Sequence, residues 1–195
     1  TTCLYPDRSR RAGMARVPYL DPEDLPAEYR EEVYSSADAE RTANVFRAIA
    51  NNPPLLSSFR KYFGYLWAES GLTEREREAV ILASARESDS VYEWHQHVRL
   101  GRAAGLDDGE IRAIGSGDLD ALPSRETRLV RYALATLRGD VDDDLFSAAA
   151  AEFDDATLVG TALLAAGYFG LARVLAALDV DLEEEFVGWD LTGGG

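Results

Sequence analysis

The spacing of apolar residues constrains the fold of this chain more than any other feature. From Ala39 to about Val180, apolar side chains recur three and four residues apart, as they do along one face of an α-helix. No alternation of Val, Ile and Thr bounded by Asn-Gly or Asp-Gly appears, which is the usual sign of a strand pair. The sequence therefore predicts an all-α fold.

Caps and breaks divide this pattern into helices. Thr73 with Glu76, and Asp107 with Glu110, are spaced as in a capping box, in which each side chain accepts from the backbone N–H of the other residue. The letters NNPP at 51–54 interrupt an apolar stripe. We expect helical segments within 21–37, 39–50, 55–67, 73–85, 91–104, 108–115, 124–137, 142–153 and 155–180.

Two further patterns concern how the helices pack. Gly160, Gly167 and Gly170 lie inside the last segment, where each costs about 1 kcal/mol relative to alanine. We therefore expect close helix contacts at these glycines. In addition, LPSRETRLV at 122–130 echoes LTEREREAV at 72–80, which indicates a degenerate repeat of two helical hairpins.

Length and composition set the class of protein. A chain of 195 residues can bury roughly 70% of its unfolded surface, so we expect a single domain over 14–195. Residues 1–13 show no period, and we expect a disordered upstream or added extension there. We found no apolar run close to the ~18 residues of a membrane span and no signal sequence, so we expect a cytoplasmic protein that does not bind membranes.

The charge of the chain is strongly acidic. The formal net charge is −15 and no basic stripe is visible, which argues against a nucleic-acid partner. Such a composition has two interpretations: the codon usage of a GC-rich genome, or adaptation to high salt, where the repulsion between acidic groups is screened. Stability measured against salt concentration distinguishes them.

Both histidines of the chain lie in YEWHQH at 92–97. Glu93 and His97 are one helical turn apart and can interact, whereas His95 lies about 200° around the axis from His97. Two histidines so placed cannot bind one metal ion from a regular helix. Glu78, on the preceding helix, points toward the apolar side, and an antiparallel hairpin would bring it to Glu93 and His97. The alternative without a function is that Glu93 and His97 form a solvated surface pair, which stabilises a helix by about 0.3 kcal/mol.

Residues from about 44 to 114 carry a recognisable pattern, L-T-x-R-E-R-E followed by Y-E-W-x-Q-H and, further on, A-G-L. This pattern resembles the carboxymuconolactone decarboxylase family, which shares its fold with the alkylhydroperoxidase D peroxidases. The resemblance implies an alkylhydroperoxidase D-like helical bundle built on antiparallel hairpins. It also implies a homo-oligomer, a trimer or hexamer.

The resemblance departs from the peroxidases at the residues that carry their chemistry. Peroxidase members have C-x-x-C with a histidine four residues later, and an upstream glutamate. Aligned on His97, the cysteines fall on Ser90 and Glu93, and the upstream glutamate on Glu78. The only cysteine of this chain is Cys3, so a thiol peroxidase is excluded.

The decarboxylase side of the family implies a lyase that needs no cofactor and acts on a small carboxylated lactone or enone. On that reading His97 gives or takes the proton, Glu93 orients His97, and Glu78 is a second acid or base. Tyr92, Trp94 and Arg99 are candidates for binding the substrate. Two alternatives stay open: a metal-dependent enzyme with Glu78, Glu93 and His97 as ligands, and a non-catalytic oligomeric binding module.

Overall fold

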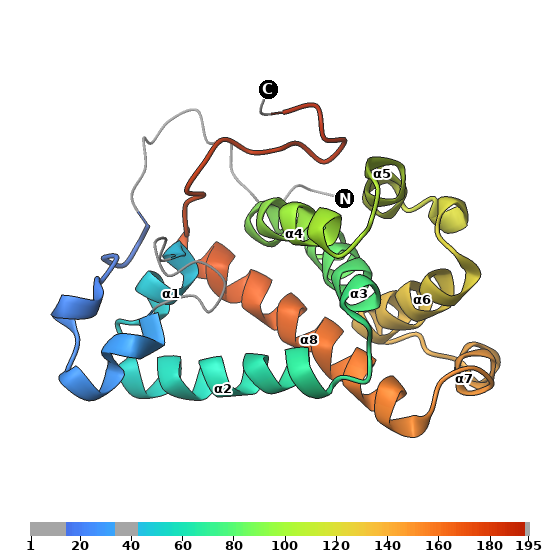
Figure 1. Cartoon of the computed structure of the whole chain (residues 1–195), viewed down its shortest axis with the longest axis horizontal. Helices are drawn as coiled ribbons and strands as arrows, with labels where there is room; N and C mark the ends of the chain where they lie inside the picture. The colour runs from blue at the N-terminus through green and yellow to red at the C-terminus, as the bar shows by residue number, and fades with distance from the viewer. Residues whose placement is uncertain (1–14, 34–42, 194–195) are drawn as a thin grey trace. The chain divides into compact units, whose positions relative to one another are not determined.

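The computed structural model describes residues 15–33 and 43–193, so the predicted extension over 1–13 lies outside the described part. Every regular element in the described ranges is a helix, as Figure 1 shows, which confirms the all-α prediction. The elements are the 3₁₀ helices η2 (Pro22–Asp24), η3 (Ala27–Val33) and η4 (Leu119–Ala121), and the α-helices α1 (Asn44–Ile49), α2 (Pro53–Glu69), α3 (Glu74–Glu87), α4 (Val91–Ala103), α5 (Asp108–Ser116), α6 (Ser124–Arg138), α7 (Asp143–Ala150) and α8 (Asp155–Leu178).

Contacts between residues divide the chain into two compact units. One unit takes in the described residues up to Gly64 together with Val174–Glu184, and the other takes in Tyr65–Arg173 and the described residues from Glu185 onward. A single domain over 14–195 stays a prediction.

The first unit is built around a small apolar cluster of Leu25, Ala50 and Leu56. The helix expected within 21–37 forms as two short 3₁₀ helices, η2 and η3, and the part from 34 to 42 is outside the described residues. The break predicted at NNPP falls between α1 and α2, and α2 begins at Pro53, where a missing N–H costs nothing.

The second unit contains the core that positions the candidate site. Both capping boxes predicted from the sequence are present, at Thr73 before α3 and at Asp107 before α5. Most of α3 is buried, from Ala79 to Ala85, and it packs against α4, α5 and α6. The α3 and α4 helices therefore form the expected hairpin, with α3 at its centre.

The predicted repeat has a structural counterpart in two reciprocal ion pairs between α3 and α6. Arg75 Nε lies 3.0 Å from Glu126 Oε1, and Arg125 Nε lies 2.5 Å from Glu76 Oε1. Each arginine and its neighbouring glutamate hold equivalent places in the two echoing segments. The N-terminal turns of α3 and α6 are thus joined by two equivalent arginine–glutamate ion pairs.

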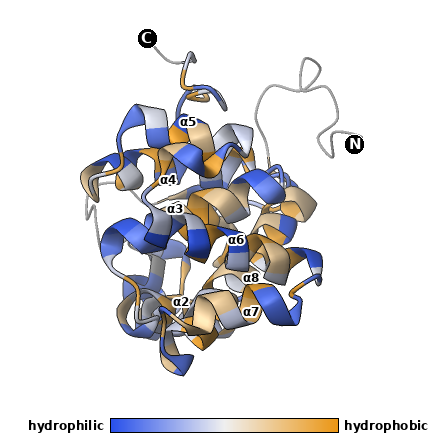
Figure 2. Cartoon of the chain, turned by 90° about the vertical axis from the view of Figure 1, so that its right-hand side faces the viewer, coloured by the Kyte–Doolittle hydropathy of each residue, from blue (hydrophilic) through white to orange (hydrophobic). Residues whose placement is uncertain are grey.

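The long helix α8 contains an apolar stretch of membrane-spanning length, which the sequence analysis did not predict. It is long and apolar enough to cross a membrane by length and composition, with a mean hydropathy of 1.6 in its most apolar window, yet half of that window is buried in the protein. Figure 2 shows its predominantly apolar colouring. A buried core helix passes the same test, so this one helix is weak evidence for a membrane span.

The glycines of α8 do not all behave as predicted. A Cβ atom at Gly160 would lie 2.2 Å from the backbone oxygen of Ser70, so this glycine permits the expected close contact. At Gly170 a Cβ would meet nothing within 4 Å, because this position is exposed. The prediction of a close contact at Gly170 was wrong, since spacing alone does not say which face of a helix is covered.

Candidate functional site

The α3–α4 hairpin brings the three predicted site residues together in the second unit. Glu78 of α3 is 1% exposed, and Glu93 and His97 of α4 are 4% and 5% exposed. The chain turns into α4 at Ser90, whose hydroxyl accepts a hydrogen bond from the backbone N–H of Glu93. The serine at a position where the peroxidases carry a cysteine thus caps the helix that bears the site.

The two carboxylates lie at opposite nitrogens of the His97 ring. Nδ1 of His97 is 2.7 Å from Oε2 of Glu78, a short hydrogen bond between buried groups. Nε2 is 3.6 Å from Oε2 of Glu93. Glu78 is therefore the partner that orients the imidazole, and Glu93 lies beside the other ring nitrogen. The sequence reading had given the orienting role to Glu93.

A guanidinium group takes part in the charge balance of the site. Arg77 Nε lies 3.5 Å from Oε1 of Glu78, and its guanidinium carbon lies 4.2 Å from the centre of the Trp67 ring. With Glu78 and Glu93 ionised and Arg77 positive, a protonated imidazole brings the net charge of this cluster to zero. A buried cluster without net charge avoids the cost of an isolated buried ion.

The pKa of His97 reflects this arrangement. Burial acts to lower the pKa, but the charge and hydrogen bond of Glu78, together with the charge of Glu93, outweigh burial and Arg77 and raise the pKa of His97 above its usual value. The imidazole is thereby held in its protonated form over a wider pH range. Such a group is suited to act as a general acid near neutral pH.

Two aromatic residues that the sequence analysis did not single out also lie at the site. Tyr168 of α8 stands edge-on to the His97 ring, with centroids 5.0 Å apart, and Trp67 lies 6.1 Å from the same ring. The indole N–H of Trp67 donates to the phenolic oxygen of Tyr168 at 2.7 Å. A tyrosine in an Ala/Leu-rich buried helix was the available signal, because a buried hydroxyl requires a partner.

His95 has a different task from His97, as helix geometry predicted. Its Nδ1 accepts a hydrogen bond from the backbone N–H of Val187, and its ring packs near Phe186. His95 therefore fastens the C-terminal segment onto α4.

The three residues predicted to bind substrate differ in how far they are exposed to solvent. Tyr92 is buried and Arg99 is exposed. Trp94 is fully buried in the core, where its N–H donates to the carbonyl of Gly188 and its ring packs on Trp189. These contacts tie Trp94 to the C-terminal segment, and the role of all three in substrate binding stays a prediction.

The geometry does not favour the metal-site alternative. Because Glu78 and Glu93 contact opposite nitrogens of one ring, the three side chains cannot all bind one ion in this arrangement. In the described part of the chain, no group of three or more His, Cys, Asp and Glu side chains could hold a metal ion.

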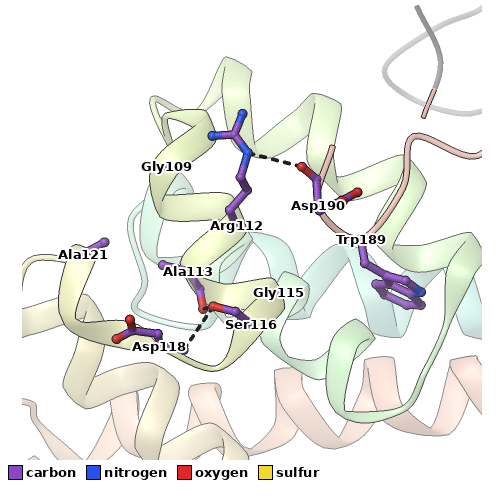
Figure 3. A pocket seen from close by; sticks show the side chains of 9 residues that line it. All are labelled: Gly109, Arg112, Ala113, Gly115, Ser116, Asp118, Ala121, Trp189 and Asp190. Atoms are coloured by element: carbon purple, nitrogen blue, oxygen red, sulfur yellow. Dashed lines mark hydrogen bonds between the residues drawn. The ribbon is translucent and has the colours of Figure 1, made fainter. Parts of the chain in front are cut away.

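A surface pocket of about 430 Å³ lies elsewhere in the second unit, next to α5 and the C-terminal segment. Figure 3 shows Arg112 on one side of it, donating from Nε to the backbone oxygen of Asp190, with Trp189 nearby. None of the predicted site residues lines this pocket.

The fold and this buried carboxylate–imidazole cluster define a class, the all-α proteins with an alkylhydroperoxidase D-like fold. Residues 53–133 match the sequence model of the carboxymuconolactone decarboxylase family. No curated protein matches the chain.

Solved structures with similar folds cover most of the chain. A peroxidase-related protein from Ralstonia eutropha JMP134 with an alkylhydroperoxidase AhpD core is 21% identical, with a TM-score of 0.81 over 94% of this chain and 100% of that one. The debrominase Bmp8, in complex with 2,3,4-tribromopyrrole, is 17% identical, with a TM-score of 0.68 over 86% of this chain and 91% of that one. A protein from Agrobacterium tumefaciens described as a putative antioxidant defence protein AhpD is 18% identical, with a TM-score of 0.63 over 70% and 96%. These similarities establish the fold.

Proposed function

We propose that the chain is a cofactor-independent acid–base enzyme, a carboxy-lyase that acts on a small carboxylated lactone or enone. The observation that carries the proposal is the buried His97, hydrogen-bonded to Glu78 through Nδ1 and flanked by Glu93 at Nε2. The match of residues 53–133 to the carboxymuconolactone decarboxylase family supports an enzymatic role of this kind.

The chemistry assigned to these residues is a decarboxylation with proton delivery to carbon. The C–C bond to the substrate carboxylate breaks, CO₂ leaves, and the electron pair moves into the conjugated carbonyl to give a dienolate. Protonated His97 then donates the Nε2 proton to carbon, and Glu78 stabilises the positive imidazolium until that transfer. The reaction consumes one proton per turnover, which comes from solvent, and Glu93, beside Nε2, is placed to take up this proton and pass it to the ring.

A thiol-based cycle has no support in the residues present. A peroxidase of the cysteine-pair type needs two sulfur atoms that form and break a disulfide. Ser90 and Glu93 hold those positions, and the sequence contains a single cysteine, Cys3. Glu93 instead supplies a carboxylate to the histidine one turn further along α4.

The proposal is tested by measuring CO₂ release from a panel of carboxylated unsaturated lactones and enones. The wild type is expected to release one CO₂ per substrate consumed. His97→Gln is expected to lose about 10²-fold or more in rate, the usual contribution of a positioned general acid. Glu93→Gln is expected to lose activity as well, because the carboxylate beside Nε2 becomes a neutral amide.

Glu74→Gln is the matched control, because Glu74 lies in the exposed first turn of the same helix as Glu78. This variant should keep wild-type activity. Unchanged turnover in His97→Gln would remove the acid role of His97. A wild type that releases no CO₂ from any member of the panel would remove the assigned substrate class.

A further inference from the structure

Arg77 contacts the site, yet the proposed chemistry gives it no role. It lies on α3 directly before Glu78, and its side chain is 11% exposed, against 2% for the side chain of Glu78. Both residues are in the second compact unit with His97. A guanidinium group so far removed from water needs fixed partners, because an isolated buried charge is costly.

Two contacts with Trp67 hold this guanidinium group in place. Nη1 of Arg77 donates to the backbone oxygen of Trp67 at 3.1 Å, and the guanidinium carbon lies 4.2 Å from the centre of the indole ring. The carbonyl belongs to the last turn of α2, where backbone oxygens have no partner within the helix. A planar guanidinium stacks well on an aromatic face. The end of α2 therefore sets where the charge of Arg77 lies.

The two oxygens of the Glu78 carboxylate have different partners. Oε1 lies 3.5 Å from Nε of Arg77, and Oε2 lies 2.7 Å from Nδ1 of His97. Among the described residues Nε of Arg77 is buried and makes no hydrogen bond, so Arg77 acts on this carboxylate through its charge. The negative charge of Glu78 is thus divided between a permanent cation and the imidazole.

We propose that Arg77 is a positioning residue that shares the Glu78 carboxylate with His97 and thereby weakens the hold of the site on the imidazole proton. Without Arg77, two carboxylates would hold this proton so tightly that the ring would be a poor donor to carbon. A general acid works best when its pKa lies near the working pH. This catalytic consequence rests on the proposed function, whereas the effect on the proton of His97 does not.

The groups that face His97 from the neighbouring helices fix the sign of the effect. Glu78 of α3 and Glu93 of α4 favour the protonated ring, and Arg77 of α3 opposes it. Tyr168 of α8 is uncharged near neutral pH, since burial raises its pKa well above the usual value. Loss of the Arg77 charge should therefore raise the pKa of His97. A residue that only kept Glu78 in place would have the opposite effect when removed.

NMR titration of the His97 imidazole tests the proposal without substrate, and the resonance is assigned by its loss in His97→Gln. Arg77→Gln removes the charge and keeps a donor for the Trp67 carbonyl. It is expected to raise the midpoint of His97 by about half a pH unit or more. Arg77→Lys restores the charge and should return the midpoint most of the way to the wild-type value. Arg77→Met keeps an unbranched side chain against the indole and should give the same rise if Arg77→Gln does not fold.

Two further variants separate sharing of the carboxylate from a general effect of charge. Arg131→Gln loses the same charge at an exposed position of α6 and should leave the midpoint of His97 unchanged. In a Glu78→Gln background, adding Arg77→Gln should move the midpoint much less than it does in the wild type, because the shared carboxylate is absent.

An unchanged or lowered midpoint in both Arg77→Gln and Arg77→Met would overturn the proposal. Equal rises with and without the Glu78 carboxylate would overturn it as well, because Arg77 would then act on His97 without Glu78. The catalytic consequence is measured by CO₂ release, whose decline at high pH should move to higher pH in Arg77→Gln while the maximal rate falls. A wild type that releases no CO₂ would remove the lyase proposal and leave the titration result standing, and an unmoved midpoint in an active enzyme would remove only the role of Arg77.

Discussion

At the residue scale, the site is a small set of buried charges that satisfy one another. Glu78 would be costly as an isolated buried carboxylate, but it bonds to His97 and lies within 3.5 Å of Arg77. Removing one partner of a buried pair leaves the other charge uncompensated, whereas exposed pairs contribute little. The Glu78–His97 pair should therefore contribute more to stability than an exposed ion pair does.

One prediction concerns the removal of Glu78. Glu78→Ala is expected to lower the free energy of unfolding by about 3 kcal/mol, since it leaves a buried imidazolium and guanidinium without their carboxylate. Glu74→Ala, on the exposed turn of the same helix, should change it by no more than about 0.5 kcal/mol. Urea denaturation of both variants at pH 6 measures the difference. Similar small losses in both would mean that the Glu78–His97 pair is not buried as described.

Another prediction concerns pH. The folded-state pKa of His97 is raised, so protonation favours the folded protein. The stability that His97 contributes is fully present below its unfolded pKa of about 6.5 and is lost as the pH rises through the higher folded value. The difference in free energy of unfolding between the wild type and His97→Asn should therefore shrink as the pH is raised from 6 to 9. A difference that grows over this range would show that the folded pKa is depressed instead.

At the element scale, helix contacts decide which glycines of α8 are required. Gly160 faces the backbone of Ser70, and Gly170 faces open space. Gly160→Ala should destabilise the protein by about 1–3 kcal/mol, because the backbone of Ser70 has to move. Gly170→Ala should stabilise it by about 0.5–1 kcal/mol through the higher helix propensity of alanine. Thermal unfolding of the two variants, side by side, checks the opposite signs, and equal effects would contradict the packing of α8.

Local features of the helices could be predicted from the sequence, whereas contacts between distant residues could not. Capping boxes at Thr73 and Asp107 predicted two helix starts, because a cap is a local device. Placing Glu78 against His97 required only the direction of one side chain and a hairpin. The contacts of Tyr168 and Trp67 could not be predicted, since these residues are 101 positions apart and meet only through tertiary packing. For the same reason spacing did not show which carboxylate would bind Nδ1.

At the scale of the whole molecule, one side of α8 has an unusually apolar surface. Val159 is 58% exposed and Leu163 is 47% exposed, and Ala166 continues the same stripe at helical spacing. Contiguous exposed apolar surface on a protein commonly marks a contact with another chain. We propose that this stripe is a self-association surface, in line with the expected homo-oligomer.

This proposal predicts the effect of a charge in the stripe. Leu163→Glu, or Val159→Glu, should reduce the mass measured by light scattering to that of a single chain, because the buried carboxylate would have no partner at the contact. Asp155→Glu, at the exposed start of the same helix, is the control and should leave the mass unchanged. A wild type that is monomeric at all concentrations would dismiss the stripe as an interface.

The measurement that bears most directly on the whole account is the NMR titration of His97 in the wild-type protein. We expect a pKa above the usual value, with N–H groups on both nitrogens of the protonated ring, because Glu78 and Glu93 flank the two sides of the ring. A His97 pKa below the usual value would contradict the central claim that the two carboxylates hold a proton on this ring.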